Sequence, residues 1–543
     1  MRMGNHTWPI IFLSGIWMLW GCSKNLKHMG EPEPEVVKNV IMIIGDGMGP
    51  QQVGLLQAYA KQSAHSVLKN RQTAFERMLQ DEGILGLSST HAANVLVPDS
   101  AASGSQLASG KPSGSEMIGS DPNGNPTTSI LEIAMSMNKS TGLVSDTRIT
   151  HATPAAFAAH QTHRSLENEI AIDMLNLGPD VMFSGGLRHW IPAEANDKES
   201  EVFLELNKMT GGSLKIKSKR TDSRHLIIEA QQKGYSLAFT KSQMMQSKGK
   251  TLGLFAYSAL PDGILETKTK NDPHRSIPTL KEMSEKALQL LSQNKNGFFL
   301  MIEAGQIDWA AHNNDTGTML HEMLRINETL NYVLDWAKNR NDTLIVVTAD
   351  HETGGFGFTY SGTNLPEPKN LPGQLFKGKD YKPNFNFGSP EILNGIYRQK
   401  RSYYDIFNSL FDKLSPNEQT PHNLMEIVNQ NTEFHITVDQ ASRILEKEDN
   451  PLYVEGHKYL WSKEVPKLDC HDSFFVYQMG DNRQNLLAIQ VEEKQMVTWS
   501  TGTHTATPVL VFAKGPPKVR ATYGQIMHHT QLAQKTINAL RGQ

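Results

Sequence analysis

The stretch VIMIIGDGMG, residues 40–49, runs five consecutive apolar residues directly into a glycine-rich turn that holds one aspartate, Asp46. An apolar run of this length is typical of a β-strand buried on both faces of a parallel sheet. Similar short apolar runs occur at residues 142–144, 180–183, 298–302, 344–348 and 509–512. These runs predict the strands of a large, mostly parallel central sheet.

Amphipathic helical patterns lie between these runs. Residues 280–291 place their apolar side chains on one stripe, and Thr279 with Glu282 forms a capping box at its start. A second apolar stripe covers residues 323–337. Strands that alternate with helices predict an α/β fold with helices on both faces of the sheet. In such folds, ligands bind beyond the carboxyl ends of the strands.

The composition is that of an ordinary globular protein. The 543 residues include 38% apolar and 20% charged side chains, which argues against wholesale disorder and against a membrane-spanning architecture. The net charge is −3, and no basic run stands out, so we expect no specific affinity for nucleic acid.

The N-terminus departs from this average. Residues 1–22 carry one arginine and an apolar run of about a dozen residues, too short to span a bilayer. They indicate a secretory signal peptide, and the ending at Cys22 resembles a bacterial lipoprotein box. We expect a bacterial protein that is exported to the periplasm or anchored to the outer membrane by a lipid on Cys22. An ordinary cleaved signal with an incidental cysteine remains the alternative, and a lipidated Cys22 could not pair with Cys470.

The remaining chain divides by composition. Residues 23–37 are polar and proline-bearing, which is typical of a linker. The main domain is expected at 38–543. Within it, residues 361–497 break the strand–helix rhythm and indicate an insertion, with helical pieces at 405–413 and 439–446 and a strand pair near 486–499. A core-like segment, residues 503–515, follows the insertion.

Acidic and histidine side chains follow the predicted strands. They are four carboxylates and three histidines, namely Asp46, Glu303, Asp308, Asp350, His312, His351 and His504. Imidazole and carboxylate together suit zinc, and oxygen ligands suit magnesium. Asp308 and His312 are four residues apart, so a helix would place both on one face. Each feature alone is weak, but four acids at one sheet edge would repel one another unless cations neutralised them.

One serine invites a separate question. In LVPDSAASGSQLASG, residues 96–110, Ser100 follows Asp99 and begins a run of small residues. The G-x-S-x-G pattern of serine hydrolases with a histidine base is absent from the sequence. If Ser100 is a nucleophile, metal coordination is a possible means of activating it.

Six ordered motifs resemble those of the alkaline phosphatase family. They are VIMIIGDGMG (40–49), DSAA (99–102), HATP (151–154) with Arg164 following, MIEAGQIDWAAH (301–312), TADHETGG (348–355) and GTH (502–504). The resemblance covers residues 39 to about 515. It implies hydrolysis of phosphate monoesters through a covalent phosphoserine at Ser100, with release of inorganic phosphate.

The resemblance also implies a site with two Zn²⁺ and one Mg²⁺. Asp308, His312 and His504 would hold one zinc. Asp46, Asp350 and His351 would hold the other. Asp46, Thr153 and Glu303 would hold magnesium. Arg164 would clamp the phosphoryl group through its planar fork.

Further expectations surround this site. We expect Asp99 to orient Arg164, and Ala101 and Ala102 to open a helix whose amides face the phosphoryl group. His151 and Trp309 stand where some bacterial members of the family carry aspartate and lysine, and they would lie beside the ligands, where they bear on the third metal.

Two other functions are alternatives to phosphomonoester hydrolysis. A phosphodiesterase or another metallohydrolase of the same superfamily is the nearer one, although Glu303 and Thr153 argue for monoesters, and the C/S-x-P-x-R pattern of sulfatases is absent around Ser100. A surface lipoprotein with a structural metal centre, or one that binds phosphate without turnover, is the other. Insertions like 361–497 often contribute to dimer interfaces in the family, so a homodimer is expected.

Overall fold

The computed structural model describes residues 37–467 and 482–543. The expected signal peptide, the linker up to residue 36, and both Cys22 and Cys470 lie outside the described residues. Among the described helices, none combines the length and the apolar character needed to cross a membrane.

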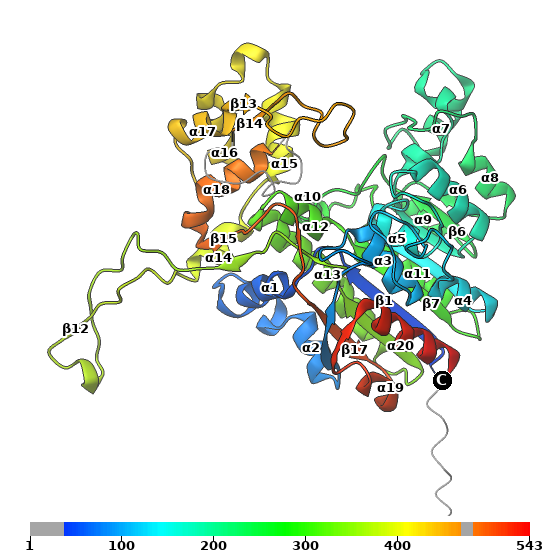
Figure 1. Cartoon of the computed structure of the whole chain (residues 1–543), viewed down its shortest axis with the longest axis horizontal. Helices are drawn as coiled ribbons and strands as arrows, with labels where there is room; N and C mark the ends of the chain where they lie inside the picture. The colour runs from blue at the N-terminus through cyan, green and yellow to red at the C-terminus, as the bar shows by residue number, and fades with distance from the viewer. Residues whose placement is uncertain (1–36, 468–481) are drawn as a thin grey trace, which may run out of the picture. The chain divides into compact units, whose positions relative to one another are not determined.

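A ten-stranded sheet forms the centre of the fold, in the order β18-β2-β17-β8-β1-β7-β3-β4-β6-β5 (Figure 1). Its strands are β1 (Asn39–Gly45), β2 (Ile84–Ser89), β3 (Ser140–Arg148), β4 (Val181–Gly185), β5 (Ser236–Ala238), β6 (Thr251–Leu254), β7 (Phe298–Ala304), β8 (Thr343–Thr348), β17 (Val509–Lys514) and β18 (Ile526–His528). β1 pairs in parallel with β7 on one side and with β8 on the other. The predicted α/β fold with a mostly parallel sheet is confirmed.

One predicted strand differs in direction. β17 runs antiparallel to both of its neighbours, β8 and β2. Its apolar run, like that of β1, predicted a buried strand correctly. Burial on two faces does not encode direction, because either orientation buries the same side chains.

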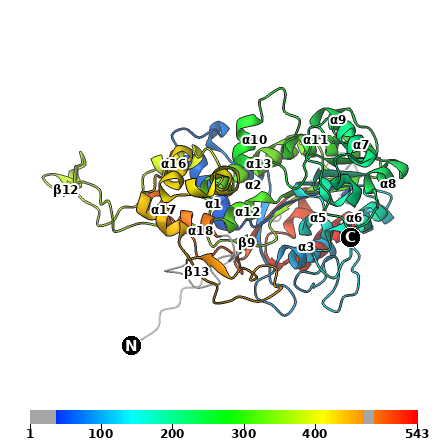
Figure 2. The ribbon, with the colours of Figure 1, turned by 90° about the horizontal axis from the view of Figure 1, so that it is seen from above.

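Helices pack on both sides of the sheet (Figures 1 and 2). The helices outside residues 361–497 are α1 (Pro50–Gln62), α2 (Ala74–Gln80), α3 (Ser100–Ser109), α4 (Ile130–Ser136), α5 (Ala152–Ala156), α6 (Glu167–Leu177), α7 (Glu201–Met209), α8 (Leu226–Gln232), α9 (Lys241–Gln246), α10 (Gly263–Thr269), α11 (Leu280–Leu291), α12 (Gln306–His312), α13 (Thr316–Ala337), α19 (Pro517–Ala521) and α20 (His529–Arg541). The two predicted helical stripes fall in α11 and α13, and the Thr279–Glu282 capping box is present.

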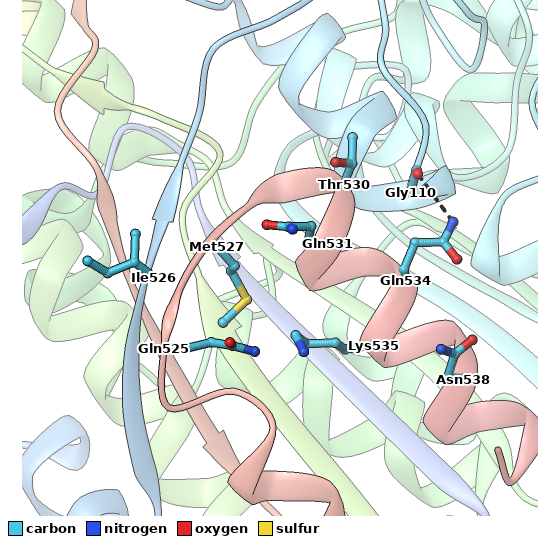
Figure 3. Close-up of a pocket in the computed structure, with 9 residues that line it drawn as sticks. All are labelled: Gly110, Gln525, Ile526, Met527, Thr530, Gln531, Gln534, Lys535 and Asn538. Atoms are coloured by element: carbon cyan, nitrogen blue, oxygen red, sulfur yellow. Dashed lines mark hydrogen bonds between the residues drawn. The ribbon is translucent and has the colours of Figure 1, made fainter.

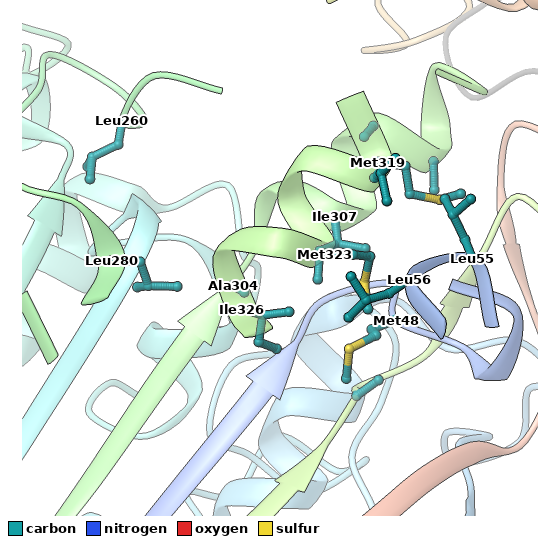
Figure 4. Close-up of a cluster of buried hydrophobic side chains, with 14 of the residues drawn as sticks. Met48, Leu55, Leu56, Leu260, Leu280, Ala304, Ile307, Met319, Met323 and Ile326 are labelled. Carbon is teal, nitrogen blue, oxygen red and sulfur yellow. The ribbon is translucent and has the colours of Figure 1, made fainter. Parts of the chain in front are cut away.

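The alternation of side chains along β1 divides the core into two halves. Ile41 and Ile43 pack with α1, α2, α11 and α13, while Val40, Met42 and Ile44 pack in the other half with α3, α4 and α20. Figure 4 shows part of the first half, where Met323 lies near Leu56 and Ile326 lies near Ala304. Burial on both faces makes β1 a rigid base for the turn that follows it.

Residues 361–497 contain short elements of their own. They are β11 (Lys369–Asn370), β12 (Asp380–Tyr381), α14 (Glu391–Tyr397), α15 (Tyr403–Asp405) with irregular helical turns to residue 413, α16 (Pro421–Asn431), α17 (Val438–Leu445), β13 (Lys447–Asp449), β14 (Glu464–Pro466), α18 (Arg483–Gln495) and β15 (Val497–Thr498). The helical predictions at 405–413 and 439–446 are confirmed. The boundaries of an inserted unit stay a prediction.

The predicted strand pair near 486–499 is wrong. The chain forms helix α18 there, followed by the two-residue strand β15. Leu487 and Val491 are four residues apart and both are buried, as on one face of a helix. A short apolar cluster fits either element, and only its packing partners decide between them.

A leucine pair tests how the sheet contributes to stability. Leu300→Ala, in the buried middle of β7, should lower the free energy of unfolding by about 2–5 kcal/mol, because it leaves a cavity between two packed layers. Leu375→Ala, at a side chain that is 92% exposed, is the matched control and should change little. Thermal denaturation followed by circular dichroism measures both. Equal effects of the two substitutions would contradict this assignment of the core.

Candidate active site

The carboxyl ends of three adjacent strands deliver most of the candidate ligands. Asp46 follows β1, Glu303 lies near the end of β7, and Asp350 with His351 follows β8. Register explains their proximity, because Ile44 of β1 pairs with Glu303 on one side and with Thr348 on the other. Helix α12 adds further ligands directly after β7, and the short strand β16 (His504–Thr505) adds one more by pairing with β9 (Glu352–Thr353).

The first cluster consists of Asp308, His312 and His504, whose candidate ligand atoms lie within 4.8 Å of one another. His312 Nδ1 donates to the Gly502 carbonyl at 2.6 Å, and His504 Nδ1 donates to the Pro98 carbonyl at 2.9 Å. Each neutral ring therefore carries its lone pair on Nε2, and these two atoms are 3.1 Å apart. Two lone pairs and a carboxylate that face one another form a set of ligands suited to a divalent cation.

The second cluster consists of Asp46, Asp308 and His351. His351 Nε2 lies 3.5 Å from Asp46 Oδ1 and 3.2 Å from Asp350 Oδ2. The structure thus brings the predicted set of Asp46, Asp350 and His351 together. It also places Asp308 in both clusters, which spacing along the sequence did not indicate.

The third cluster consists of Asp46, Glu303 and His151, a histidine that the sequence placed beside the ligands. Its Nδ1 lies 3.5 Å from Glu303 Oε1 and 3.9 Å from Asp46 Oδ2, so the ring is one of the clustered donors. Thr153 follows two residues later in α5, and its hydroxyl is buried. His151 immediately precedes that helix, and this place in the chain was the available signal for its role.

Unsatisfied atoms at these clusters test whether metal ions fit. Within residues 37–467 and 482–543, several buried side-chain atoms here lack a hydrogen-bond partner, namely Asp46 Oδ1 and Oδ2, Glu303 Oε1, Asp350 Oδ2, His151 Nδ1 and Thr153 Oγ1. Burying a charged group without a partner costs several kcal/mol. The atoms without partners are carboxylate oxygens, an imidazole nitrogen and a hydroxyl oxygen. These are atom types that ligate divalent cations, so the residues fit such metals.

The shifted pKa values of the clustered residues also indicate that the site binds cations. Burial, together with Asp350, Asp308 and Glu303, raises the pKa of Asp46 well above its usual value. Burial and the charge of Asp308 raise the pKa of Asp350 to about 7. Burial of His351, next to His504, lowers its pKa well below the usual value and keeps the ring neutral, as a metal ligand must be. Protein groups alone thus leave Asp46 and Asp350 poorly compensated, whereas at Asp308 the neighbouring His312 and His504 outweigh burial and lower the pKa.

Ser100 opens helix α3 beside these clusters. Its Oγ lies 3.1 Å from His351 Nε2, and the side chain is buried. The Asp99 carboxylate caps the helix by accepting from Ala101 N at 2.9 Å and from Ala102 N at 3.4 Å. Asp99 therefore occupies these two amides, and the expectation that the N-terminal amides of the helix face a phosphoryl group stays a prediction.

Arg164 lies next to Asp99 and His151, and Trp309 lies next to His151. Arg164 Nη1 donates to Asp99 Oδ2 at 3.1 Å, and its Nη2 lies 3.4 Å from His151 Nε2. The indole of Trp309 meets the ring of His151 edge-on, with centroids 5.9 Å apart. The structure thus brings Ser100, Arg164 and the clustered acids and histidines close to one another, while Thr153 is placed by its position in α5 alone.

Two residues that orient the candidate ligands, Thr353 and His529, were not predicted from the sequence. Thr353 Oγ1 donates to Asp308 Oδ1 at 2.5 Å and lies 3.3 Å from His351 Nδ1. His529 Nε2 donates to the Asp350 carbonyl at 2.7 Å, and its Nδ1 is 2.8 Å from Ser88 Oγ. His529 stands 179 residues after Asp350, and no spacing rule connects the two.

A separate hollow lies between β18 and helix α20 (Figure 3). Its lining consists of Gly110, Gln525, Ile526, Met527, Thr530, Gln531, Gln534, Lys535 and Asn538. Gln534 donates to the Gly110 carbonyl at 3.2 Å. This lining has no carboxylate and no histidine, so the hollow does not share the chemistry of the clusters.

A mostly parallel sheet that carries buried carboxylate and histidine clusters beside a serine and an arginine defines a metal-dependent hydrolase. Comparison with known proteins identifies which one. The family model "Alkaline phosphatase" matches residues 37–541, and this chain belongs to the alkaline phosphatase family. Members of this family are metal-dependent phosphomonoesterases, and this chain is one of them.

Individual relatives agree. Alkaline phosphatase 3 of Bacillus subtilis (strain 168) is 30% identical over 514 residues, which cover 93% of this chain and 89% of the relative. The crystal structure of a cold-active alkaline phosphatase from Shewanella sp. is 26% identical with a TM-score of 0.65, and the match covers 92% of this chain and 99% of that one. For the fold alone, the alkaline phosphatase of Thermus thermophilus gives a TM-score of 0.72 at 23% identity, over 94% and 92% of the two chains.

Metal removal should reverse the effect of one substitution. A chelator should lower the Tm of the protein, because the buried carboxylates lose their counter-charges. In the chelated protein at pH 8, Asp46→Asn should raise the Tm, since the amide avoids the cost of burying or protonating this carboxylate. In the metal-loaded protein the same substitution should lower the Tm, because the neutral amide is a weaker ligand.

Differential scanning fluorimetry with elemental analysis measures these effects. Asp335→Asn, at an exposed aspartate paired with Arg77, is the matched control and should shift the Tm little in either state. A lower Tm for Asp46→Asn in both states would contradict the account of the clusters.

Proposed function

We propose that this phosphomonoesterase acts through a covalent phosphoserine at Ser100, with two zinc ions and one magnesium ion. The main observation in support is that Ser100 Oγ lies 3.1 Å from Nε2 of His351, a candidate ligand in the second cluster. Asp308, His312 and His504 would hold one zinc. Asp46, Asp350 and His351 would hold the other. Asp46, Glu303 and Thr153, with His151 beside them, would hold magnesium.

The metal ions, when bound, supply Lewis-acid stabilisation of phosphoryl oxygens and favour ionisation of the serine hydroxyl. Ser100 Oγ forms a bond to phosphorus as the bond from phosphorus to the ester oxygen breaks. The hydroxyl proton ends on the departing alcohol. Water then attacks the phosphoserine, and inorganic phosphate leaves as Ser100 regains its proton.

Arg164 has the position and the geometry of a phosphate clamp. Asp99 accepts from its Nη1, which fixes the plane of the guanidinium next to Ser100. A planar fork binds two phosphoryl oxygens at once, and this geometry makes lysine a poor substitute. Charge on the equatorial oxygens is the main demand of phosphoryl transfer, and Arg164 contributes to meeting it.

The third cluster bears on the choice between monoesters and diesters. A phosphodiesterase or another metallohydrolase of the superfamily is the alternative. The gathering of Asp46, Glu303 and His151, with the orphaned hydroxyl of Thr153, supports a third cation and therefore a monoester. A strong preference for bis-p-nitrophenyl phosphate over p-nitrophenyl phosphate would overturn the monoester assignment.

Replacing the nucleophile separates the chemistry from the metal centre. Ser100→Ala should abolish hydrolysis of p-nitrophenyl phosphate, leaving less than about 10⁻³ of the activity, because no covalent intermediate can form. Elemental analysis should show unchanged zinc and magnesium. Ser109→Ala, at the far end of the same helix, is the matched control and should keep full activity. Normal turnover by Ser100→Ala would refute the mechanism.

Export and lipid anchoring are further proposals. Residues 1–22 support a signal peptide of the lipoprotein type, with Cys22 as the lipidated residue. A protein of this kind would work in the periplasm or at the outer membrane, where it would meet phosphate monoesters outside the cytoplasm.

A homodimer is also proposed, on the evidence of an exposed apolar segment, residues 358–387. Its exposed large apolar side chains are Phe358, Tyr360, Leu365, Leu375, Tyr381, Phe385 and Phe387, while Leu371 and Phe376 are half-buried. The ring of Tyr360 lies 5.1 Å from that of Phe385 and 5.3 Å from that of Phe387. Monomers rarely expose so many apolar side chains together, and a second copy of the chain would cover them.

Light scattering tests this interface. The protein at micromolar concentration should have twice the mass of one chain, and Phe385→Ser with Phe387→Ser should shift it toward the monomer. Ile526→Ser, at an exposed residue outside this segment, should leave the mass unchanged. A purely monomeric wild-type protein would argue against the proposal.

A further inference from the structure

Glu116, on the loop between α3 and α4, has an unusual backbone conformation. Its φ is +62°, in the left-handed region that residues with a side chain seldom adopt. Such a conformation persists where the surrounding contacts hold it. The contacts of Glu116 therefore indicate what the conformation is for.

The main chain of Glu116 touches both members of the Asp99–Arg164 pair. Its N–H donates to Asp99 Oδ1 at 2.8 Å. Its carbonyl accepts from the N–H of Arg164, also at 2.8 Å. Asp99 Oδ2 in turn accepts from Arg164 Nη1. Glu116 thus connects the Asp99 carboxylate, which orients the Arg164 guanidinium, to the main chain of Arg164.

The side chain of Glu116 adds a second link to the same segment. Its Oε2 lies 2.9 Å from His163 Nε2, and His163 directly precedes Arg164. His163 Nδ1 accepts from the N–H of Ser165 at 3.1 Å, so the neutral ring has its proton on Nε2 and donates it to Glu116. The side chains of His163 and Glu116 are 40% and 47% exposed, and the pair stands outside the buried clusters.

Further bonds anchor this loop. Ile118 and Gln161 exchange two backbone hydrogen bonds, of 2.9 and 3.0 Å, two residues beyond Glu116. Ser105 Oγ, in the helix that Ser100 opens, accepts from the N–H of Gly119 at 2.8 Å. The loop therefore connects the helix of the nucleophile to the segment that carries Arg164.

We propose that Glu116 is a positioning residue that holds the Arg164 guanidinium in place relative to Ser100. It acts through its left-handed backbone and through its pair with His163, and it makes no contact with phosphate itself. The inference rests on the proposed role of Arg164 as the phosphate clamp. The loss of the Glu116 side chain would let segment 163–165 move and would spoil the bidentate geometry.

Binding of inorganic phosphate to the zinc- and magnesium-loaded enzyme, measured by calorimetry, tests the proposal without relying on turnover. Glu116→Ala should weaken phosphate binding about five- to tenfold, the range expected for coupled neighbours in one network. Glu116→Gln should stay within about twofold of wild type, because its amide oxygen still accepts from His163 Nε2. Metal content should be unchanged in both variants.

Glu82→Ala is the matched control. Glu82 is also a glutamate with a left-handed backbone, with φ +66°, and its carboxylate pairs with Arg520 at 2.9 Å on the exposed surface. Replacing it removes the same side chain from the same conformation, away from the clusters. Phosphate affinity should remain at the wild-type value.

A double-mutant cycle identifies the route of the effect. In an Arg164→Ala background, measured at higher phosphate concentrations, Glu116→Ala should cause no further loss, because the group that it positions is absent. An equal loss in both backgrounds, or no loss in either, would overturn the proposal. Ser100→Ala with normal turnover would instead defeat the proposed mechanism, so the two failures are distinguishable.

Discussion

The structure depends on one electrostatic constraint, the crowding of buried carboxylates and imidazole lone pairs at the carboxyl edge of the central sheet. Asp46, Glu303 and Asp350 follow or end three adjacent strands, and strand register alone brings them together. Without cations this arrangement would be unfavourable, and the raised pKa of Asp46 and Asp350 expresses that cost. The protein therefore maintains an unfavourable arrangement of its own charges, which metal ions would compensate.

A ring of orienting bonds holds the ligands in that arrangement. The carbonyls of Gly502 and Pro98 fix the tautomers of His312 and His504. His529 holds the main chain at Asp350 from the C-terminal helix. These partners come from segments far apart in the sequence, so the centre couples the two ends of the described chain. Asp99, Glu116 and Arg164 form a second small hydrogen-bond network next to Ser100. This network extends from the buried clusters to the protein surface.

Strand β1 and the helix that carries Asp308 and His312 could be predicted from the sequence, because each depends on a pattern of neighbouring residues. The apolar run before Asp46 predicted β1, and the four-residue spacing of Asp308 and His312 predicted one face of a helix, which α12 provides. The direction of β17 and the helix at 483–495 were missed, because apolar content reports burial and not pairing partners. The sequence placed His151 beside the ligands, and its distances to Asp46 and Glu303 come only from the tertiary structure.

The sequence by itself determined the fold class, the family and the identities of the candidate ligands, because periodicity and short motifs depend on neighbours along the chain. Tertiary structure decided which atoms face one another. It assigned Asp308 to two clusters and gave the Asp99 carboxylate to the helix amides. It also joined Glu116 to Arg164, 48 residues later. Such contacts arise from strand register and loop packing, and these are settled only when the whole core is assembled.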